Sequence, residues 1–255
     1  MMKCTFLGTG TSMGVPVAGG FGSERINGDP RNQRYRCSVW IQTEETSLII
    51  DTGPEFRLQS IRSGINKIDL VLITHEHMDH IAGLDDLRAY NYVQKSAIPL
   101  YTCPRTAKSI RERFRYMFGP DKYPGSTSVE IVETNQPFTF NDLKISPLTY
   151  NHGLIDVQGY RIGDFSYMTD VKSVPEETME RIKGSRVLVL SGLRWAPEHP
   201  THLTIPEALE FAENLNIPKT YLIHMNSFVD HQYSNEKLPK HVQLAYDMLE
   251  ITIPN

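Results

Sequence analysis

Apolar positions along the chain fall into short strand-like runs separated by helical stretches. In the first half, β-rich runs cover Lys3 to Leu7, Cys37 to Gln42 and Leu48 to Asp51. A helical stretch near Glu55 to Arg62 follows, and then a continuous apolar strand from Asp69 to Thr74. The first half therefore predicts a β-meander, a helix and a buried strand, in that order.

The second half repeats this order. Strand-like runs and helical stretches alternate there as well: Leu143 to Thr149, Gln158 to Ile162 and Phe165 to Met168, a helix near Pro175 to Lys183, a strand at Arg186 to Leu190, a helix at Ile205 to Asn214 and a strand at Thr220 to His224. Two such sets predict two sheets packed face to face with helices outside, although the pattern also fits other α/β layouts. Neither a composition break nor a linker divides the chain, so we expect a single domain over residues 1–255.

The charge balance of the chain excludes a strongly basic surface. Its 255 residues are 40% hydrophobic and 22% charged, and 26 Lys and Arg against 30 Asp and Glu give a formal net charge of -4. Such a chain has no field that would hold nucleic acid non-specifically, so we expect no nucleic-acid partner. No run approaches the roughly 18 apolar residues of a membrane span. The apolar run Met1 to Leu7 is too short for an export signal, so we expect a cytoplasmic protein without membrane contact.

Candidate chemistry lies in histidine rather than cysteine. Three dispersed cysteines cannot build a disulfide framework or a cysteine zinc site, which fits a reducing compartment, whereas the chain has nine histidines. The segment His75-Glu76-His77-Met78-Asp79-His80 directly follows a predicted strand and holds four metal-capable side chains within six positions.

Alternation along this segment predicts two neighbouring metal sites. Residues two apart on an extended chain point the same way, so His75 and His77 can share one ion. Asp79 and His80, past the bend, can face a second ion. The alternative is that Asp79 is only the N-cap of a helix that begins near Ile81.

His-x-His-x-Asp-His at the end of a strand resembles the signature of the metallo-β-lactamase-fold hydrolases. The resemblance extends over nearly the whole chain and implies a four-layer αββα sandwich. In that superfamily the remaining ligands end later strands, and His152, Asp170 and His224 match those positions. Taken singly, each of the three would be read as a turn or core residue, but their order favours the ligand interpretation.

The resemblance implies two divalent metal ions. One set of ligands is His75, His77 and His152, the other is Asp79, His80 and His224, and Asp170 bridges both ions. Nitrogen and oxygen ligands suit Zn²⁺, Mn²⁺ or Fe, so the identity of the ion stays open, with Zn²⁺ or Mn²⁺ as the expected cofactors. A histidine rather than a glutamate at position 77 departs from the oxygen-reducing di-iron relatives, which favours hydrolysis.

Within the superfamily, the chain is most similar to the branch that contains the cyclic phosphodiesterase of phosphonate breakdown, and more distantly to the tRNA 3′-processing endonuclease. The stretches that carry this likeness are Phe6 to Pro16, Asp29 to Asn32 with Arg34 and Arg36, Pro200 to Thr204, and Asp230-His231 with Asn235 to Pro239. The resemblance implies that His202 donates a proton to the departing oxygen or a hydrogen bond to a phosphoryl oxygen. The alternative is that it only precedes a helix. His231 is either part of a substrate loop or a surface residue, and no function is assigned to His199 or His241.

Two departures from the branch stand out. The loop from Gly19 to Glu24 lacks the cysteine cluster that binds a structural zinc in the phosphonate-pathway relative, and Ser227 replaces the completing histidine. The resemblance therefore implies no structural zinc here. Ser191 stands where the branch usually places an aspartate, which could alter the support of the metals or of His202.

We therefore expect a dinuclear metal-dependent hydrolase in which a metal-bridging hydroxide attacks a small, cyclic phosphodiester substrate. Asp170 and His202 are its expected catalytic residues. The alternatives are a lactone or thioester hydrolase, because the same metal pair can polarise a carbonyl, and a metal-bound protein without catalysis. The oligomeric state stays open, with a homodimer among the options.

Overall fold

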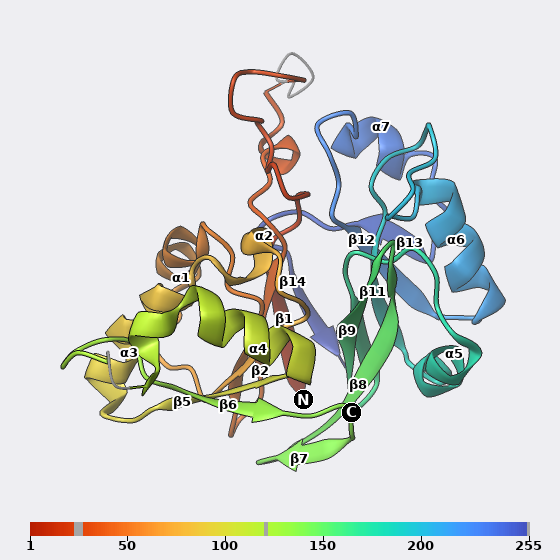
Figure 1. The fold of residues 1–255 in the computed structure, drawn as a ribbon. Coiled ribbons are helices and arrows are strands. Elements are labelled where there is room, and N and C mark those ends of the chain that lie inside the picture. The colour runs from red at the N-terminus through yellow and green to blue at the C-terminus, as the bar shows by residue number, and fades with distance from the viewer. Residues whose placement is uncertain (23–27, 120–121, 254–255) are drawn as a thin grey trace.

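Two sheets packed face to face form the centre of the computed structural model, which describes residues 1–22, 28–119 and 122–253 (Figure 1). Within those ranges the first sheet has seven strands in the order β14-β1-β2-β3-β4-β5-β6. Their bounds are Met2–Gly8 (β1), Ser38–Gln42 (β2), Ser47–Ile50 (β3), Leu70–Leu72 (β4), Ile98–Thr102 (β5), Val129–Glu133 (β6) and Glu250–Ile253 (β14).

The second sheet mirrors the first. Its order is β13-β12-β11-β10-β9-β8-β7. The strands are Phe138–Phe140 (β7), Leu143–His152 (β8), Ile155–Ile162 (β9), Phe165–Met168 (β10), Val187–Ser191 (β11), Lys219–Ile223 (β12) and Val242–Leu244 (β13). In each sheet an antiparallel meander continues into parallel strands, β3 to β6 in one and β10 to β13 in the other. The carboxyl ends of these parallel strands therefore share one edge of each sheet.

Helices cover the outer face of each sheet (Figure 1). The first sheet carries Phe56–Ser63 (α1), Leu87–Gln94 (α3) and Pro104–Arg113 (α4), and the second carries Glu176–Ile182 (α5) and Ile205–Asn214 (α6). The short helices Met78–Ile81 (α2) and His231–Asn235 (α7) lie near the strand ends. Short 3₁₀ helices in the described connecting segments lie at Pro30–Asn32, Leu84–Asp86 and Arg115–Met117. The layers confirm the αββα sandwich that the sequence predicts.

Alternating side chains explain why the fold has four layers. In β2, Val39 and Ile41 face the core between the sheets, whereas Trp40 packs in the cluster under α1 and α3. In β4, Leu70 and Leu72 face inward and Val71 outward. Successive residues of a strand point to opposite faces, so runs that are apolar at every position are buried on both sides.

The structure corrects one alternative and adds elements that the pattern does not reveal. Helix α2 begins at Met78 with His77 as its N-cap, so Asp79 lies within the first turn and is not the cap. Strands β6 and β14 escape the pattern because most of their side chains are partly or fully exposed.

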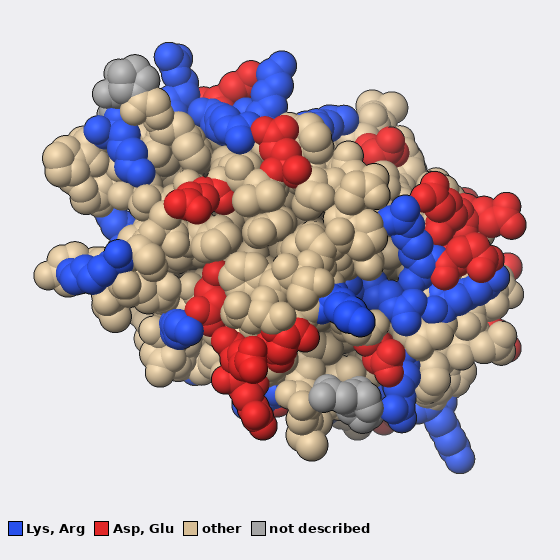
Figure 2. All heavy atoms as spheres, turned by 90° about the horizontal axis from the view of Figure 1, so that it is seen from below, with Lys and Arg blue, Asp and Glu red and all other residues tan. Residues whose placement is uncertain are grey.

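Charges of both signs are interspersed on the face of the molecule that Figure 2 shows. Figure 2, which shows the face seen from below, has Lys and Arg beside Asp and Glu with no single sign covering that face. This agrees with the formal net charge of -4. Within the described ranges, no helix combines the length and apolarity needed to cross a membrane.

Candidate metal centre

The residues singled out by the histidine motif meet at one edge of the sandwich. His75 follows β4, His152 is the last residue of β8, and His224 directly follows β12. Asp170 lies two residues beyond β10. Strands β4, β8, β10 and β12 all end at this edge, which is why residues separated by about 150 positions become neighbours.

Among the described residues, four overlapping groups of side chains there could each hold an ion, with ligand atoms within 4.8 Å of one another. The groups are His75, His77 and His152; Asp79, His80 and His224; His75, His80 and Asp170; and His152, Asp170 and His202. The first two coincide with the two ligand sets that the resemblance implies. Asp170 belongs to groups that contain members of both sets, so its carboxylate lies between them.

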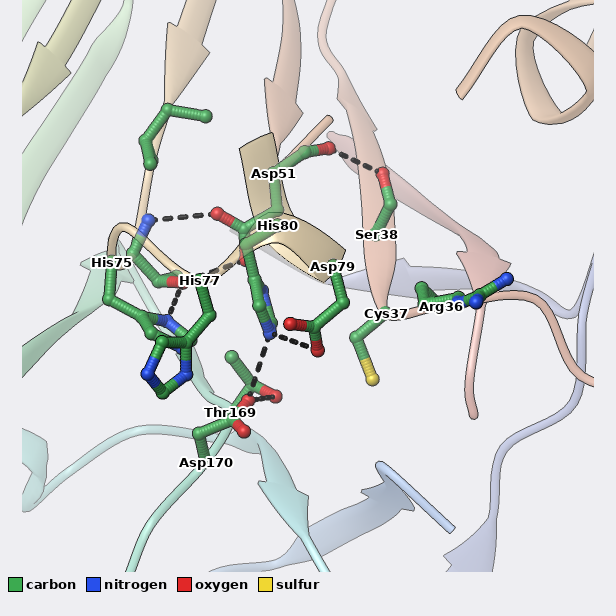
Figure 3. A network of polar contacts seen from close by, with 12 residues as sticks. Arg36, Cys37, Ser38, Asp51, His75, His77, Asp79, His80, Thr169 and Asp170 are labelled. Atoms are coloured by element: carbon green, nitrogen blue, oxygen red, sulfur yellow. Dashed lines mark hydrogen bonds and ion pairs between the residues drawn. The ribbon is translucent and has the colours of Figure 1, made fainter. Parts of the chain in front are cut away.

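Distances support this intermediate position of Asp170. Its Oδ1 lies 3.1 Å from Nε2 of His224 and 3.9 Å from Nε2 of His152, while Oδ2 lies 3.3 Å from Nε2 of His80. The same His80 nitrogen is 3.2 Å from Asp79 (Figure 3). One buried carboxylate thus contacts imidazoles from both ligand sets.

The chemistry of these side chains fits two divalent cations. Nε2 of His75 and Nδ1 of His77 face each other at 3.0 Å. Nε2 of His80 and both ring nitrogens of His224 are buried and make no hydrogen bond within the described chain. Buried polar atoms normally have partners. Imidazole lone pairs that converge with carboxylates are the donor set of a divalent transition metal.

Backbone strain marks the same strand ends. Asp51, Asp170 and His224 have φ angles of 63°, 58° and 60°. Residues other than glycine rarely adopt this left-handed conformation, and such strain clusters at functional sites. Each of the three follows a strand and turns its side chain toward the cluster instead of continuing the sheet.

Asp51 is a site residue that the sequence reasoning missed. Its buried Oδ2 lies 2.7 Å from Nδ1 of His80 and accepts a hydrogen bond from Thr74 Oγ1, while Oδ1 accepts one from the Thr74 amide (Figure 3). A carboxylate in this position orients the imidazole and leaves its Nε2 for an ion. The signal was an aspartate at the end of a predicted strand, but only the pairing of β3 with β4 places it beside His80.

Two further contacts support the ligands. Nδ1 of His152 donates to the carbonyl of Thr201 at 2.8 Å, which leaves Nε2 facing the cluster. Ser191 Oγ accepts the amide of Val171 at 3.0 Å, directly after Asp170. The serine that departs from the branch therefore still supports the backbone of the central aspartate.

The carboxylates and imidazoles of the cluster shift one another's pKa values in opposite directions. Burial alone would raise the pKa of Asp170, but His224 and His80 beside it hold that pKa well below its usual range. Burial likewise opposes charge on His80, yet Asp79, Asp51 and Asp170 raise its pKa well above the usual value. These carboxylates favour the charged form of His80, and a metal ion bound at Nε2 would take the place of the proton there.

His202 lies at the cluster and not merely before a helix. Its ring centroid is 4.6 Å from that of His152 and 4.7 Å from that of His224, and its Nδ1 is 3.7 Å from Asp170 Oδ1. Burial, followed by the charge of His224, lowers the pKa of His202 to about 3. Its imidazole is therefore neutral near pH 7.

His231 is buried, so the surface alternative is wrong. Its amide donates to Asn32 Oδ1 at 2.8 Å, its Nε2 lies 2.8 Å from Asn235 Nδ2, and its ring packs edge-on against Tyr246. These contacts give it a packing role between the arginine-bearing loop and the segment before β14.

The loop that lacks cysteines packs against the segment that contains Ser227 and Phe228. Of that loop the structure describes Gly19 to Gly22, while Ser23 and Glu24 lie outside the described residues. Phe21 packs edge-on against Phe228 with ring centroids 5.4 Å apart. A Cβ at Gly22 would lie 2.3 Å from Ser227 Oγ, so the loop also lies directly on that serine.

Comparisons with known proteins agree with this geometry. Residues 46–225 match the family described as Beta-lactamase superfamily domain. A solved structure, described as a new diphosphatase from the PhnP family, is 35% identical, covers 100% of this chain and 98% of its own, and superposes with a TM-score of 0.91.

Two sequence relatives are longer proteins. An octanoyltransferase of Porphyromonas gingivalis is 38% identical over 99% of this chain but only 52% of its own length. A ribonuclease Z of Saccharolobus islandicus is 27% identical over 74% of this chain and 57% of its own length. The chain thus spans about half the length of these relatives. On the family match and the full-length structural likeness, the chain belongs to the metallo-β-lactamase-fold hydrolases, in the branch of the PhnP family.

Proposed function

We propose that the protein is a dinuclear metal-dependent phosphodiesterase that hydrolyses a small phosphodiester, cyclic diesters included. The observation that carries this proposal is the pair of three-ligand groups joined through Asp170, with His202 beside them. Zn²⁺ or Mn²⁺ suits these nitrogen and oxygen ligands. A small substrate rather than a nucleic acid agrees with the net charge of -4, and a cytoplasmic location agrees with three free cysteines.

In such a reaction some residues bind the metal ions and others orient the ligand side chains. When bound, two divalent ions would lower the pKa of a water between them and balance the charge of the phosphoryl group. Asp170 sets the separation of the two ligand groups, because one carboxylate serves both. Asp51 and the Thr201 carbonyl hold His80 and His152 in orientation, so the ligand atoms are placed before any ion or substrate arrives.

Two roles are considered for His202, hydrogen-bond donor to the phosphoryl group and general acid. Its surroundings favour the first role before substrate binds. A neutral imidazole can donate one N–H to a phosphoryl oxygen. Acting as a general acid requires a second proton, which its low pKa does not supply near pH 7 before substrate binds. We therefore propose that His202 binds the phosphoryl group as a neutral donor. Proton delivery to the leaving oxygen then requires that a bound phosphoryl anion first raise its pKa.

Hydrolysis of a thioester or lactone is the second candidate. The longer relative named octanoyltransferase gives acyl chemistry specific support, since it matches 99% of this chain. That support is limited, because 48% of the relative lies outside the match and its name belongs to the whole protein. The diphosphatase named among the solved structures matches end to end, which favours phosphorus over carbonyl chemistry.

One experiment separates the candidates. Protein loaded with Zn²⁺ or with Mn²⁺ is offered a bis-aryl phosphodiester and an aryl thioester side by side, and we expect turnover of the phosphodiester. Preferential thioester turnover would move the assignment to acyl chemistry. Silence on both substrates with two ions bound would favour the metal-bound protein without catalysis.

The Asp170→Ala variant tests the site itself. Removing the shared carboxylate should lower the bound metal below two ions per chain and abolish turnover, because both ligand groups lose a member. Metal content by elemental analysis and turnover of the bis-aryl phosphodiester report the two effects. An Asp156→Asn variant, which changes an exposed carboxylate of β9, is the control and should retain both. Two bound ions and normal turnover in Asp170→Ala would contradict the assignment.

A further inference from the structure

A row of imidazoles extends outward from the metal cluster. His202 stacks on His224 with ring centroids 4.7 Å apart, and His199 lies 4.9 Å from His202. His202 belongs to one of the candidate ligand groups, whereas His199 belongs to none of those found among the described residues. His199 is therefore a half-buried histidine next to the reaction site that neither the metals nor the reaction at phosphorus uses.

Hydrogen bonds to Thr201 orient the His199 ring. The amide of Thr201 donates to Nδ1 of His199 at 3.3 Å, and the Thr201 hydroxyl lies 3.2 Å from the same nitrogen. An imidazole nitrogen that accepts an amide hydrogen carries no proton, so the neutral ring bears its hydrogen on Nε2. The ring thus has one donor group that Thr201 leaves available.

The segment that ends at His199 contains one cation, Arg194, and one exposed acid, Glu198. Arg194 Nε donates to the carbonyl of Pro197 and Nη2 donates to that of Glu198, so the guanidinium holds this segment through backbone oxygens. Among the described residues, no carboxylate forms an ion pair with Arg194. The Nη2 hydrogen bond at 3.1 Å places the guanidinium at the carbonyl of the residue that precedes His199, and burial and then the positive charge of Arg194 lower the pKa of His199. Lys172 lies nearby, but Glu207 pairs with it at 2.9 Å.

We propose that Arg194 and His199 form a subsite for a second phosphoryl group of the substrate, so that the preferred substrate is a diphosphate diester rather than a diester of a single phosphate. The inference rests on the proposed phosphodiesterase and specifies its substrate class. The phosphoryl group that reacts lies at the metal cluster beside His202. The neighbouring phosphoryl group receives the Nε2 hydrogen bond of His199 and the charge of Arg194.

The reaction then consumes one water. The water oxygen forms a bond to the phosphorus at the cluster, and the bond from that phosphorus to the bridging oxygen breaks. The bridging oxygen leaves with the second phosphoryl group as a phosphate monoester. One proton of the water stays with the first product and the other passes to the second, so the products are two monoesters. His199 is a specificity-determining residue in this step because it touches the departing group and not the phosphorus that reacts.

The test compares two substrates that share their aryl groups and differ in phosphoryl number. Metal-loaded protein is assayed on bis(p-nitrophenyl) phosphate and on P1,P2-bis(p-nitrophenyl) diphosphate, with products resolved by phosphorus NMR. We expect His199→Phe to reduce kcat/KM for the diphosphate by about 10- to 100-fold, the effect of one hydrogen bond to a charged group, mainly through KM. The same variant should stay within about twofold of wild type on the monophosphate.

Binding supplies a readout that does not depend on turnover. Calorimetry with the methylene-bridged analogue of the diaryl diphosphate should show the same loss of affinity in His199→Phe, and a diaryl phosphinate should show none. His199→Gln keeps an N–H donor and should recover part of the preference. His241→Phe, which removes a histidine far along the chain before β13, is the control and should match wild type throughout.

The outcomes separate this inference from the function on which it rests. Equal loss on both substrates, with two ions still bound, would assign His199 a structural role and overturn the subsite. Unchanged kinetics and binding of both ligands in His199→Phe would overturn it as well. Wild-type protein that binds two ions but hydrolyses neither substrate would contradict the phosphodiesterase proposal. Binding then tests the subsite by itself, and equal affinity of the wild-type protein for the methylene-bridged analogue and for the phosphinate would contradict it.

Discussion

At the scale of single residues, the candidate metal centre depends on groups that are not themselves ligands. Asp51 lies beside Nδ1 of His80, and the Thr201 carbonyl accepts Nδ1–H of His152. Each contact directs the opposite ring nitrogen toward the cluster. Outer contacts of this kind set the orientation and the basicity of a ligand, so their loss weakens metal binding without removing a donor atom.

Asp51→Asn should therefore reduce metal affinity by about 10- to 100-fold while leaving the number of binding sites at two. The amide keeps the size of the side chain but removes the charge that favours the His80 orientation. Competitive titration against a metal-binding dye measures the affinity, with Asp156→Asn as the exposed control. An affinity equal to that of wild type would show that the His80 ring is held by packing alone.

At the scale of secondary-structure elements, strand ends do the positioning. His152, Asp170 and His224 close β8, β10 and β12, and the parallel relation of those strands brings them to one edge. The strand β11 contributes differently, because its last residue, Ser191, accepts the amide of Val171. That contact ties the end of one strand to the turn that carries the central aspartate.

Ser191→Ala should lower the free energy of unfolding by about 1 to 3 kcal/mol, because the buried Val171 amide loses its acceptor. Urea unfolding of the metal-free protein measures this, and the midpoint should fall with no change of slope. Ser96→Ala, on an exposed turn, should leave the midpoint unchanged. If Ser191→Ala also leaves it unchanged, the serine does not support the turn, and its difference from the branch carries no structural consequence.

At the scale of the whole molecule, a buried carboxyl links the two ends of the chain. Asp247, between β13 and β14, accepts hydrogen bonds from Thr9 Oγ1 at 2.8 Å and from the Tyr35 amide at 2.7 Å. Burial raises the pKa of Asp247 from 3.8 to about 7. The folded protein therefore binds a proton at this site more tightly than the unfolded chain does.

Stability should consequently fall as pH rises from 3.8 toward 7. In that window the folded state holds the Asp247 proton and the unfolded state has lost it, so this group removes about 1.4 kcal/mol per pH unit. In Asp247→Asn the amide can donate to Thr9 and accept from Tyr35, and this part of the slope should disappear. Urea unfolding of both proteins between pH 5 and pH 8 provides the comparison. Parallel pH profiles would place the pKa of Asp247 near its ordinary value.

The sequence predicts the strands of the two sheets and the residues of the candidate metal centre to different extents. The meander, helix and buried-strand order predicts most central strands, because their apolar runs are buried on both faces. Strands β5, β6, β7, β13 and β14 lie outside the predicted runs. β6 and β14 are mostly exposed, β7 and β13 have only three residues each, and Pro99 interrupts the apolar run of β5. The motif from His75 to His80 was legible because its ligands are adjacent in sequence, and the resemblance supplied the later strand ends.

The sequence by itself determined the alternation of apolar runs, the density of histidines and the scarcity of cysteine, and these are local properties of the chain. Only the tertiary structure decided that Asp51 supports His80, that His231 is buried, and that His199 stands next in line after His202. The physical reason is that strand pairing and packing bring together residues far apart in sequence. A contact between such residues leaves no periodic signal in either segment.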